Sequence, residues 1–143
     1  MNILCVCTGN ICRSPMMEFL LKQELPKHGI TDAEVRSAGV HTMDDEPASA
    51  HAITVMQELG IDIADHRSRQ LNRDIASWAD VAVVLSPEHG VAMAFYYGFP
   101  PEKVLTVGNG IEDPYGRDLK SYRACRDQLI KDLPALIEAL KAV

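Results

Sequence analysis

The sequence contains no apolar run long enough to span a membrane, no internal repeat and no low-complexity or linker-like stretch. A membrane-spanning helix needs about 20 consecutive apolar residues. The first predicted strand follows Met1 directly, without the basic region and apolar core of a signal peptide. We therefore expect a single domain over residues 1–143 that does not associate with membranes.

Positive charge is also scarce, because 14 lysine and arginine residues stand against 20 aspartate and glutamate residues, for a net charge of −6. This balance argues against a nucleic-acid-binding protein, which normally presents a basic face. Apolar residues make up 47% of the chain and charged residues 24%, as is typical of a folded globular protein. A few arginines can still make one cleft of an acidic protein positive.

The cysteine spacing fits neither a disulfide framework nor a zinc site. Cys5, Cys7 and Cys12 lie within eight residues, Cys125 stands far from them, and no CxxC pair occurs. We therefore expect free, functional thiols in a reducing cytoplasm, and neither a metal nor a cofactor.

Strand and helix patterns alternate along the chain. Short apolar runs predict strands, and 3.6-residue periodicity and capping residues predict helices. The expected strands cover 2–7, 33–38, 80–85 and 103–107, and the expected helices cover 15–25, 48–59, 87–97 and about 25 residues after 116. We expect Ser14 to cap the first helix, Pro15 to be its first residue, and Pro134 to kink or divide the last helix. Trp78, Cys125 and the aromatic residues 95–97 are expected to pack in the interior.

This alternation predicts an α/β three-layer sandwich, in which helices cover both faces of a four-stranded parallel sheet. In such folds ligands bind beyond the carboxyl ends of the strands. Cys7 lies at the carboxyl end of the first strand.

The segment from Cys7 to Ser14 has the chemistry of an anion-binding loop. It joins a strand to the beginning of a helix, where backbone N–H groups are unpaired and the helix dipole favours negative charge. Gly9 offers conformational freedom for a tight turn, and Asn10 tolerates left-handed backbone angles. The guanidinium of Arg13 can hold two phosphate oxygens, and the positive field favours the thiolate form of Cys7.

Other interpretations of this loop fit less well. It lacks both the Gly-Lys-Ser/Thr sequence of a Walker motif and the three spaced glycines of a dinucleotide site. A buried strand cysteine is common, and we prefer that interpretation for Cys5. For Cys7 and Arg13, the Cys-x5-Arg spacing alone is weak evidence. Together with Gly9 and the strand-to-helix setting it favours a phosphate site.

The segment Val6–Pro15 resembles the signature loop of the low-molecular-weight protein tyrosine phosphatases. Three further segments are similar to that family, namely Arg36–Gly39, His66–Leu71 and Asp113–Tyr115. The resemblance therefore extends over essentially the whole chain. It implies a flavodoxin-like sheet with strand order 2-1-3-4, and we expect a monomer or a weak dimer.

The resemblance implies a cysteine-dependent enzyme that hydrolyses phosphotyrosine in proteins through a thiophosphoryl-cysteine intermediate. Cys7 would be the nucleophile, Arg13 the phosphate clamp and Asp113 the general acid. The implied phosphate-binding residues form the loop itself: Thr8, Gly9, Asn10, Ile11, Cys12, Arg13 and Ser14. The implied supporting network consists of Asn10, Ser14, Ser37 and His66, and Cys12 would guard Cys7 from oxidation through a reversible disulfide. Without the resemblance, Asp113 before Pro114 is more typical of a cap or turn residue, and His66 of a surface or cap residue.

The expected substrate rim is poor in aromatic residues, since it comprises Ile11, His41, Met43 and Tyr115. The segment 39–47 has no aromatic ring, and Tyr115 is followed by Gly116 and not by a second tyrosine. Similar bacterial protein arginine phosphatases tend to have threonine at the position of Ile11. Ile11 therefore favours phosphotyrosine, with arginine phosphatase activity as the alternative.

Two other functions fit less well. An arsenate reductase on this fold needs a further cysteine pair after the His66 region, and no cysteine lies between Cys12 and Cys125. A non-catalytic module that binds phosphate would lack Cys7 or Asp113, and both are present. A redox sensor that uses Cys7 and Cys12 is better explained as regulation of the phosphatase. The expected partner is therefore a phosphorylated protein substrate, with a bacterial tyrosine kinase as one candidate.

Overall fold

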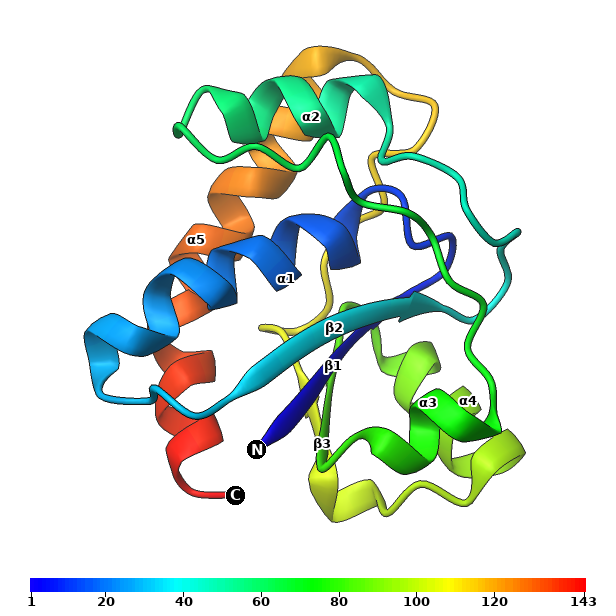
Figure 1. The fold of residues 1–143 in the computed structure, drawn as a ribbon. Coiled ribbons are helices and arrows are strands. Elements are labelled where there is room, and N and C mark those ends of the chain that lie inside the picture. The colour runs from blue at the N-terminus through cyan, green and yellow to red at the C-terminus, as the bar shows by residue number, and fades with distance from the viewer.

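The computed structural model describes residues 1–143 and contains one parallel sheet of four strands (Figure 1). The strands are β1 (Asn2–Cys7), β2 (Glu34–Gly39), β3 (Val81–Val84) and β4 (Val104–Thr106), in the order β2-β1-β3-β4. The predicted α/β fold and strand order are thereby confirmed. In this register Cys7 pairs with Gly39 and Val6 pairs with Val84, so the carboxyl ends of the three strands meet at one edge.

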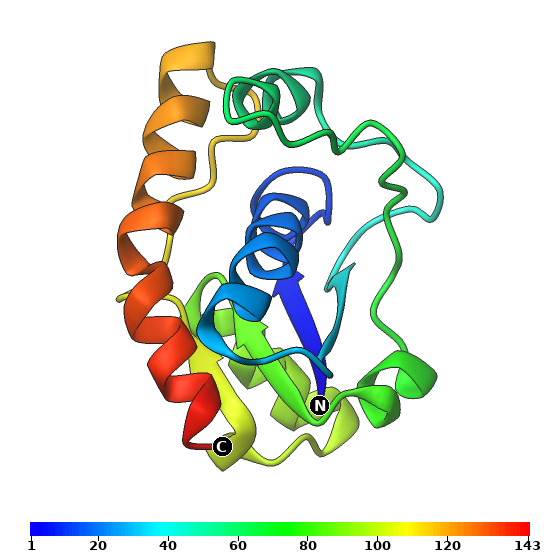
Figure 2. The same cartoon turned by 60° about the vertical axis from the view of Figure 1, so that its left-hand side comes forward.

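Helices cover both faces of this sheet, as Figures 1 and 2 show. Helices α1 and α5 lie on one face, with α2 packed against α5, while α3 and α4 lie on the other face. Their bounds are α1 (Arg13–Glu24), α2 (Ala50–Gln57), α3 (Arg73–Trp78), α4 (Pro87–Tyr97) and α5 (Leu119–Lys141), with short 3-10 turns at Leu25–His28 and Pro101–Lys103. No helix combines the length and the apolar character that crossing a membrane requires.

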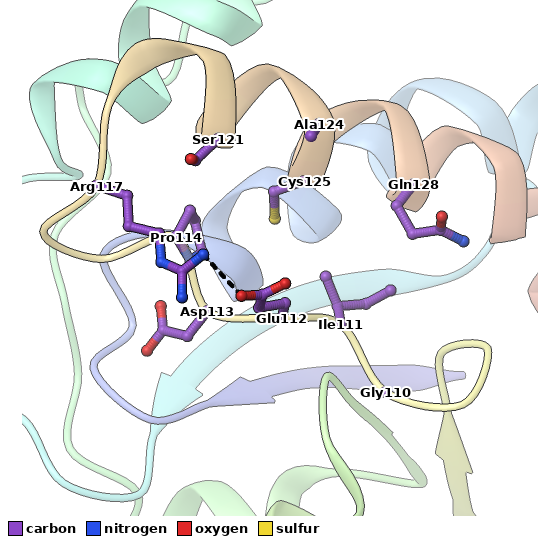
Figure 3. Close-up of a pocket in the computed structure, with 10 residues that line it drawn as sticks. All are labelled: Gly110, Ile111, Glu112, Asp113, Pro114, Arg117, Ser121, Ala124, Cys125 and Gln128. Carbon is purple, nitrogen blue, oxygen red and sulfur yellow. Dashed lines mark ion pairs between the residues drawn. The ribbon is translucent and has the colours of Figure 1, made fainter.

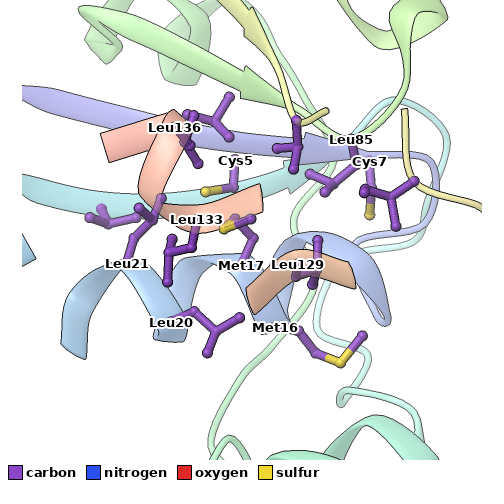
Figure 4. Close-up of a cluster of buried hydrophobic side chains, with 14 of the residues drawn as sticks. Cys5, Cys7, Met16, Met17, Leu20, Leu21, Leu85, Leu129, Leu133 and Leu136 are labelled. Atoms are coloured by element: carbon purple, nitrogen blue, oxygen red, sulfur yellow. The ribbon is translucent and has the colours of Figure 1, made fainter. Parts of the chain in front are cut away.

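Two hydrophobic clusters follow from the period-two alternation of side chains along the strands. Ile3 and Cys5 of β1 face α1 and α5, whereas Leu4 and Val6 face α3 and α4. Figure 4 shows the larger cluster, in which side chains of α1 and α5 gather around Cys5. Cys7 belongs to the same cluster, so the packed core fixes the position of its sulfur.

The first helix begins two residues earlier than expected, and the predicted N-cap at Ser14 is wrong. Helix α1 begins at Arg13 after Cys12, because the Ser14 hydroxyl is occupied by the Cys7 sulfur at 2.9 Å and by the Asn10 amide at 2.8 Å. Pro15 is accordingly the third helical residue. It is tolerated there because N–H groups of the first turn have no partner inside the helix.

Other differences concern the later helices. The six-residue α3 was not predicted, and Asn72 caps it by accepting a hydrogen bond from the Ile75 N–H at 2.9 Å. Helix α5 is not divided but continues through Pro134, with buried leucines on both sides of the proline. Phe95 and Tyr96 do not pack in the interior, since 79% and 66% of their surfaces are exposed.

The remaining aromatic predictions hold. The Tyr97 ring packs against the smaller cluster, and its hydroxyl donates to the Leu71 carbonyl at 2.9 Å. Trp78 packs against the same cluster beneath the Arg36 guanidinium, and Cys125 is buried.

Candidate active site

The loop after β1 closes on the neighbouring strand through a glycine. A Cβ atom at Gly39 would lie 2.7 Å from the Thr8 carbonyl oxygen, so only glycine allows this approach. Beyond it, the Val40 and His41 N–H groups donate to the Cys7 and Thr8 carbonyls, each at 3.0 Å. The end of β2 therefore holds the beginning of the loop in place.

Asn10, and not Gly9, supplies the left-handed turn of the loop. Asn10 has a φ of 56°, whereas Gly9 is absent from the residues with positive φ. Gly9 therefore does not adopt the left-handed backbone conformation that glycine allows. Asn10 adopts it, and its side chain is fully buried.

Every polar group of Asn10 is used to brace the loop. Its amide nitrogen donates to the hydroxyls of Ser14 at 2.8 Å and Ser37 at 2.9 Å, and its side-chain oxygen accepts from the Arg69 N–H at 2.8 Å. Its backbone N–H points at the Cys7 sulfur at 3.2 Å. The structure thus brings together three of the four expected network residues around the thiol.

The fourth, His66, contacts the same asparagine from the backbone side. Its Nε2 lies 2.7 Å from the Asn10 carbonyl oxygen. Because a carbonyl only accepts, Nε2 carries the hydrogen. Burial lowers the pKa of His66, which favours the neutral ring.

Hydrogen-bond direction along this network determines what reaches the Cys7 sulfur. Ser14 accepts the Asn10 N–H, so its own hydrogen is free to donate to the sulfur 2.9 Å away. Ser37 likewise accepts from Asn10 and donates to the Glu18 carboxylate at 2.6 Å. A sulfur that receives both a hydroxyl and a backbone N–H is in the environment that a thiolate requires.

Arg13 lies beside the thiol with most of its guanidinium fixed. Only 4% of the residue is exposed. One terminal nitrogen donates to the Ser86 hydroxyl at 2.8 Å and to the Ile111 carbonyl at 2.9 Å, and the other donates to the Thr8 hydroxyl at 3.3 Å. Its Nε is buried without a hydrogen-bond partner in the protein. A buried donor left unpaired is costly, which suits a group that binds an oxyanion.

Asp113 reaches the same guanidinium from the loop after β4. Its carboxylate lies 3.5 Å from the terminal nitrogen of Arg13 that contacts Thr8, and 45% of the Asp113 side chain is exposed. Its other oxygen accepts the Tyr115 N–H at 3.1 Å, which orients the turn. The carboxylate therefore faces both the clamp and the solvent.

A cavity of about 590 Å³ opens above these groups. The four expected rim residues all line it, together with Cys7, Arg13 and Asp113: Ile11, His41, Met43 and Tyr115. Met43 and Tyr115 are 73% and 66% exposed and stand away from the core, whereas Ile11 is partly buried and packs against the larger hydrophobic cluster. Glu46 and Pro47 complete one wall.

A second cavity of about 380 Å³ lies behind the loop that carries Asp113 (Figure 3). Ile111, Pro114 and Cys125 are among the residues that line it, and an Arg117–Glu112 ion pair of 2.7 Å lies at its side. Ile111 and Pro114 are themselves buried, so these two residues anchor the loop that carries Asp113.

The Cys12 sulfur is held away from solvent. It lies 3.2 Å from the Tyr122 hydroxyl and 3.6 Å from the Ser49 hydroxyl. Burial raises the pKa of the Cys12 thiol, and burial also raises the pKa of Cys125 to about 12. All four cysteines are free thiols in this structure.

Several residues of the site were not anticipated from the sequence, namely Glu18, Ser86, Ile111, Tyr122 and His89. They reach the loop from four different parts of the fold, and none of them belongs to a recognisable sequence motif. The nearest thing to a signal is the Ser86-Pro87-Glu88-His89 segment, which follows β3 at the edge where ligands were expected.

Comparison with known proteins agrees with this geometry. The family model for "Low molecular weight phosphotyrosine protein phosphatase" matches residues 2–143. The protein-arginine-phosphatase of Geobacillus stearothermophilus is 37% identical, over 98% of this chain and 96% of its own length. The probable low-molecular-weight protein-tyrosine-phosphatase EpsP of Ralstonia nicotianae is 33% identical, over 99% and 97%.

Among solved structures, a mutant of the YwlE arginine phosphatase with a phosphorylated active-site serine superposes with a TM-score of 0.89. It is 33% identical, over 99% of this chain and 96% of its own. The chain therefore belongs to the low-molecular-weight phosphotyrosine protein phosphatase family and is a phosphatase.

Proposed function

We propose that this phosphatase hydrolyses phosphotyrosine in proteins through a covalent phosphocysteine at Cys7. The observation that carries the proposal is the pairing of the braced Cys7 sulfur with a buried Arg13 whose Nε has no partner in the protein. Phosphoryl transfer requires a nucleophile and a group that binds the phosphoryl oxygens, and the beginning of α1 supplies both.

In the first step the Cys7 thiolate attacks phosphorus in line, the sulfur–phosphorus bond forms and the bond to the ester oxygen breaks. Arg13 and the loop N–H groups hold the non-bridging oxygens as charge develops on them. Asp113, placed at the cavity mouth beside Arg13, donates the proton that the leaving oxygen needs.

In the second step water attacks the phosphocysteine, and Asp113 accepts a proton from it. The sulfur–phosphorus bond breaks, phosphate leaves and the thiolate returns. Ser14 donates to that thiolate and so favours its departure. No step uses a metal, and we expect turnover to be unchanged by a chelator.

The phosphotyrosine assignment depends on the rim. Ile11, Met43 and Tyr115 present apolar surface around the cavity mouth, and an aromatic ring buries apolar area favourably against such groups. The related EpsP protein is named a tyrosine phosphatase. The partner would be a phosphorylated protein, a bacterial tyrosine kinase among the candidates.

Protein arginine phosphatase activity is the second candidate. Glu46 and Asp113 both line the cavity, and two carboxylates suit a guanidinium leaving group. The Geobacillus stearothermophilus relative is named a protein-arginine-phosphatase.

The two candidates are separated by comparing kcat/KM on matched peptides carrying phosphotyrosine, phosphoarginine or phosphoserine, with Cys7→Ser as the inactive control. We expect the highest value on phosphotyrosine. A preference for phosphoarginine would replace the substrate assignment while leaving the mechanism intact.

We further propose that Cys12 guards Cys7 against oxidation. Peroxide would oxidise the Cys7 thiolate to a sulfenic acid, and the Cys12 thiol would displace water from it to form a disulfide that a thiol reductant cleaves. Cys12→Ser is expected to lose recovery of activity by dithiothreitol after peroxide, with little change before it. Full recovery in that variant would contradict the guard role.

A further inference from the structure

His89 is a buried histidine with no part in the mechanism above. It lies in the first turn of α4 and is 1% exposed. Its Nε2 is 3.0 Å from the Thr8 hydroxyl, and its Nδ1 accepts the Ser86 N–H at 3.1 Å. It therefore touches the two residues whose hydroxyls hold the terminal nitrogens of Arg13.

The direction of these bonds is fixed by their partners. A backbone N–H only donates, so Nδ1 of His89 carries no hydrogen and Nε2 of the neutral ring must carry it. Burial and the nearby Arg13 charge lower the pKa of His89 to about 4, which keeps the ring neutral. The Thr8 hydroxyl oxygen then accepts from both His89 and Arg13.

The two residues whose hydroxyls accept from the terminal nitrogens of Arg13 are thus both hydrogen-bonded to the His89 imidazole. On one side Thr8 accepts from Arg13, and on the other the Ser86 hydroxyl accepts from it at 2.8 Å. A guanidinium fixed at both terminal nitrogens has one orientation, and in it Nε remains the donor without a protein partner.

We propose that His89 is a positioning residue for phosphoryl binding, which acts by holding the Thr8 hydroxyl as an acceptor for Arg13 so that the guanidinium meets the oxyanion in a fixed plane. This inference rests on the phosphoryl-binding role of Arg13. It does not depend on whether tyrosine or arginine carries the phosphate.

Two variants separate this role from helix capping. In His89→Asn the side-chain oxygen can still accept from the Ser86 N–H, but no group reaches Thr8. In His89→Gln the amide N–H reaches the Nε2 position and can donate to Thr8. We expect His89→Asn to lower kcat/KM on p-nitrophenyl phosphate about tenfold and to raise the orthovanadate inhibition constant by a similar factor, the effect of one lost hydrogen bond. His89→Gln should recover most of both.

Val91→Ala, at an exposed position of α4, is the matched control and should change neither value. The midpoint of thermal unfolding of His89→Asn should stay within about 2 °C of the parent. A His89→Asn variant with normal vanadate affinity would overturn the proposal, as would equal losses in His89→Asn and His89→Gln.

A double-mutant cycle with Thr8→Val tests the route. If His89 acts through Thr8, the double variant His89→Asn/Thr8→Val is no worse than Thr8→Val alone. Additive losses would show that His89 acts elsewhere. Because neither vanadate nor p-nitrophenyl phosphate contains a peptide, failure of this proposal leaves the peptide specificity test and the Cys7→Ser control unaffected.

Discussion

At the scale of single residues, the site depends on which groups can only donate and which can only accept. The Ser14 hydroxyl donates to the Cys7 sulfur because its oxygen already accepts from Asn10. The Thr8 hydroxyl accepts from Arg13 and also from His89, which is a donor at Nε2. The sequence predicts Cys7 and Arg13 from their spacing together with Gly9 and the strand-to-helix setting. His89 could not be predicted, because its role arises only where α4 meets the loop after β1.

The residue with the most direct kinetic prediction is Asp113. Replacing it with asparagine removes the proton donor but keeps the shape of the turn. We expect Asp113→Asn to lower kcat by roughly 10²–10⁴-fold on esters with poor leaving groups, and by less on p-nitrophenyl phosphate. The measurement is a plot of log kcat against leaving-group pKa for both proteins. Parallel lines would remove Asp113 from the protonation step.

At the scale of elements, the hydrophobic pattern predicts the strands and most helices well because each element buries a continuous face. The pattern fails where tertiary packing, or competition between partners for one side chain, determines where a helix begins or ends. Ser14 is withdrawn from capping by Cys7 and Asn10, the leucines of α5 carry that helix through Pro134, and α3 is too short to show a period. Phe95 and Tyr96 are exposed, although aromatic side chains are usually expected in the core.

The contact between β2 and the catalytic loop gives a prediction at this scale. Gly39→Ala places a Cβ 2.7 Å from the Thr8 carbonyl oxygen, a backbone atom that cannot move without the loop. We expect a loss of about 1–3 kcal/mol in unfolding free energy together with reduced kcat/KM. Denaturant unfolding measures the unfolding free energy, and turnover of p-nitrophenyl phosphate measures kcat/KM.

Gly9→Ala is the matched control for stability, because its nearest neighbour to a new Cβ would be the Ile11 side chain at 3.7 Å and its φ is not positive. It should cost much less unfolding free energy than Gly39→Ala. Equal losses in the two variants would mean that the close approach at Gly39 is not what constrains this position.

At the scale of the whole molecule, one topological rule accounts for the location of the site. The carboxyl ends of β1, β2 and β3 meet at one edge, where β1 ends at Cys7, β2 ends at Gly39 and Ser86 follows β3. That much follows from the strand–helix alternation in the sequence. The convergence of Glu18, Tyr122 and Asp113 on the same loop does not, because it depends on how α1, α5 and the loop after β4 pack.

The buried histidines make the stability of the whole fold depend on pH. The pKa of His89 is lowered to about 4, whereas histidine in an unfolded chain titrates near 6.5. Between these values the unfolded chain binds more protons, so the His89 contribution to stability is complete above pH 6.5 and decreases as the pH falls toward 4. His66 shifts in the same direction.

Urea unfolding across this pH range measures the effect. His89→Gln is expected to lose less unfolding free energy on acidification than the parent does, because the variant has no imidazole to protonate. His28→Gln, which removes an exposed histidine, is the control and should follow the parent curve. A His89→Gln curve parallel to that of the parent would contradict this origin of the acid sensitivity.

The central claim is that phosphate passes through Cys7, and trapping the intermediate tests it most directly. Asp113→Asn should accumulate the phosphocysteine during p-nitrophenyl phosphate turnover, because bond cleavage with this leaving group needs little acid assistance while hydrolysis lacks its base. We expect rapid quenching and mass spectrometry to find one phosphoryl group on the peptide that contains Cys7, and none when Cys7 is alanine in the same background. Turnover by the Cys7→Ala protein, or a phosphoryl group on any other residue, would contradict the account.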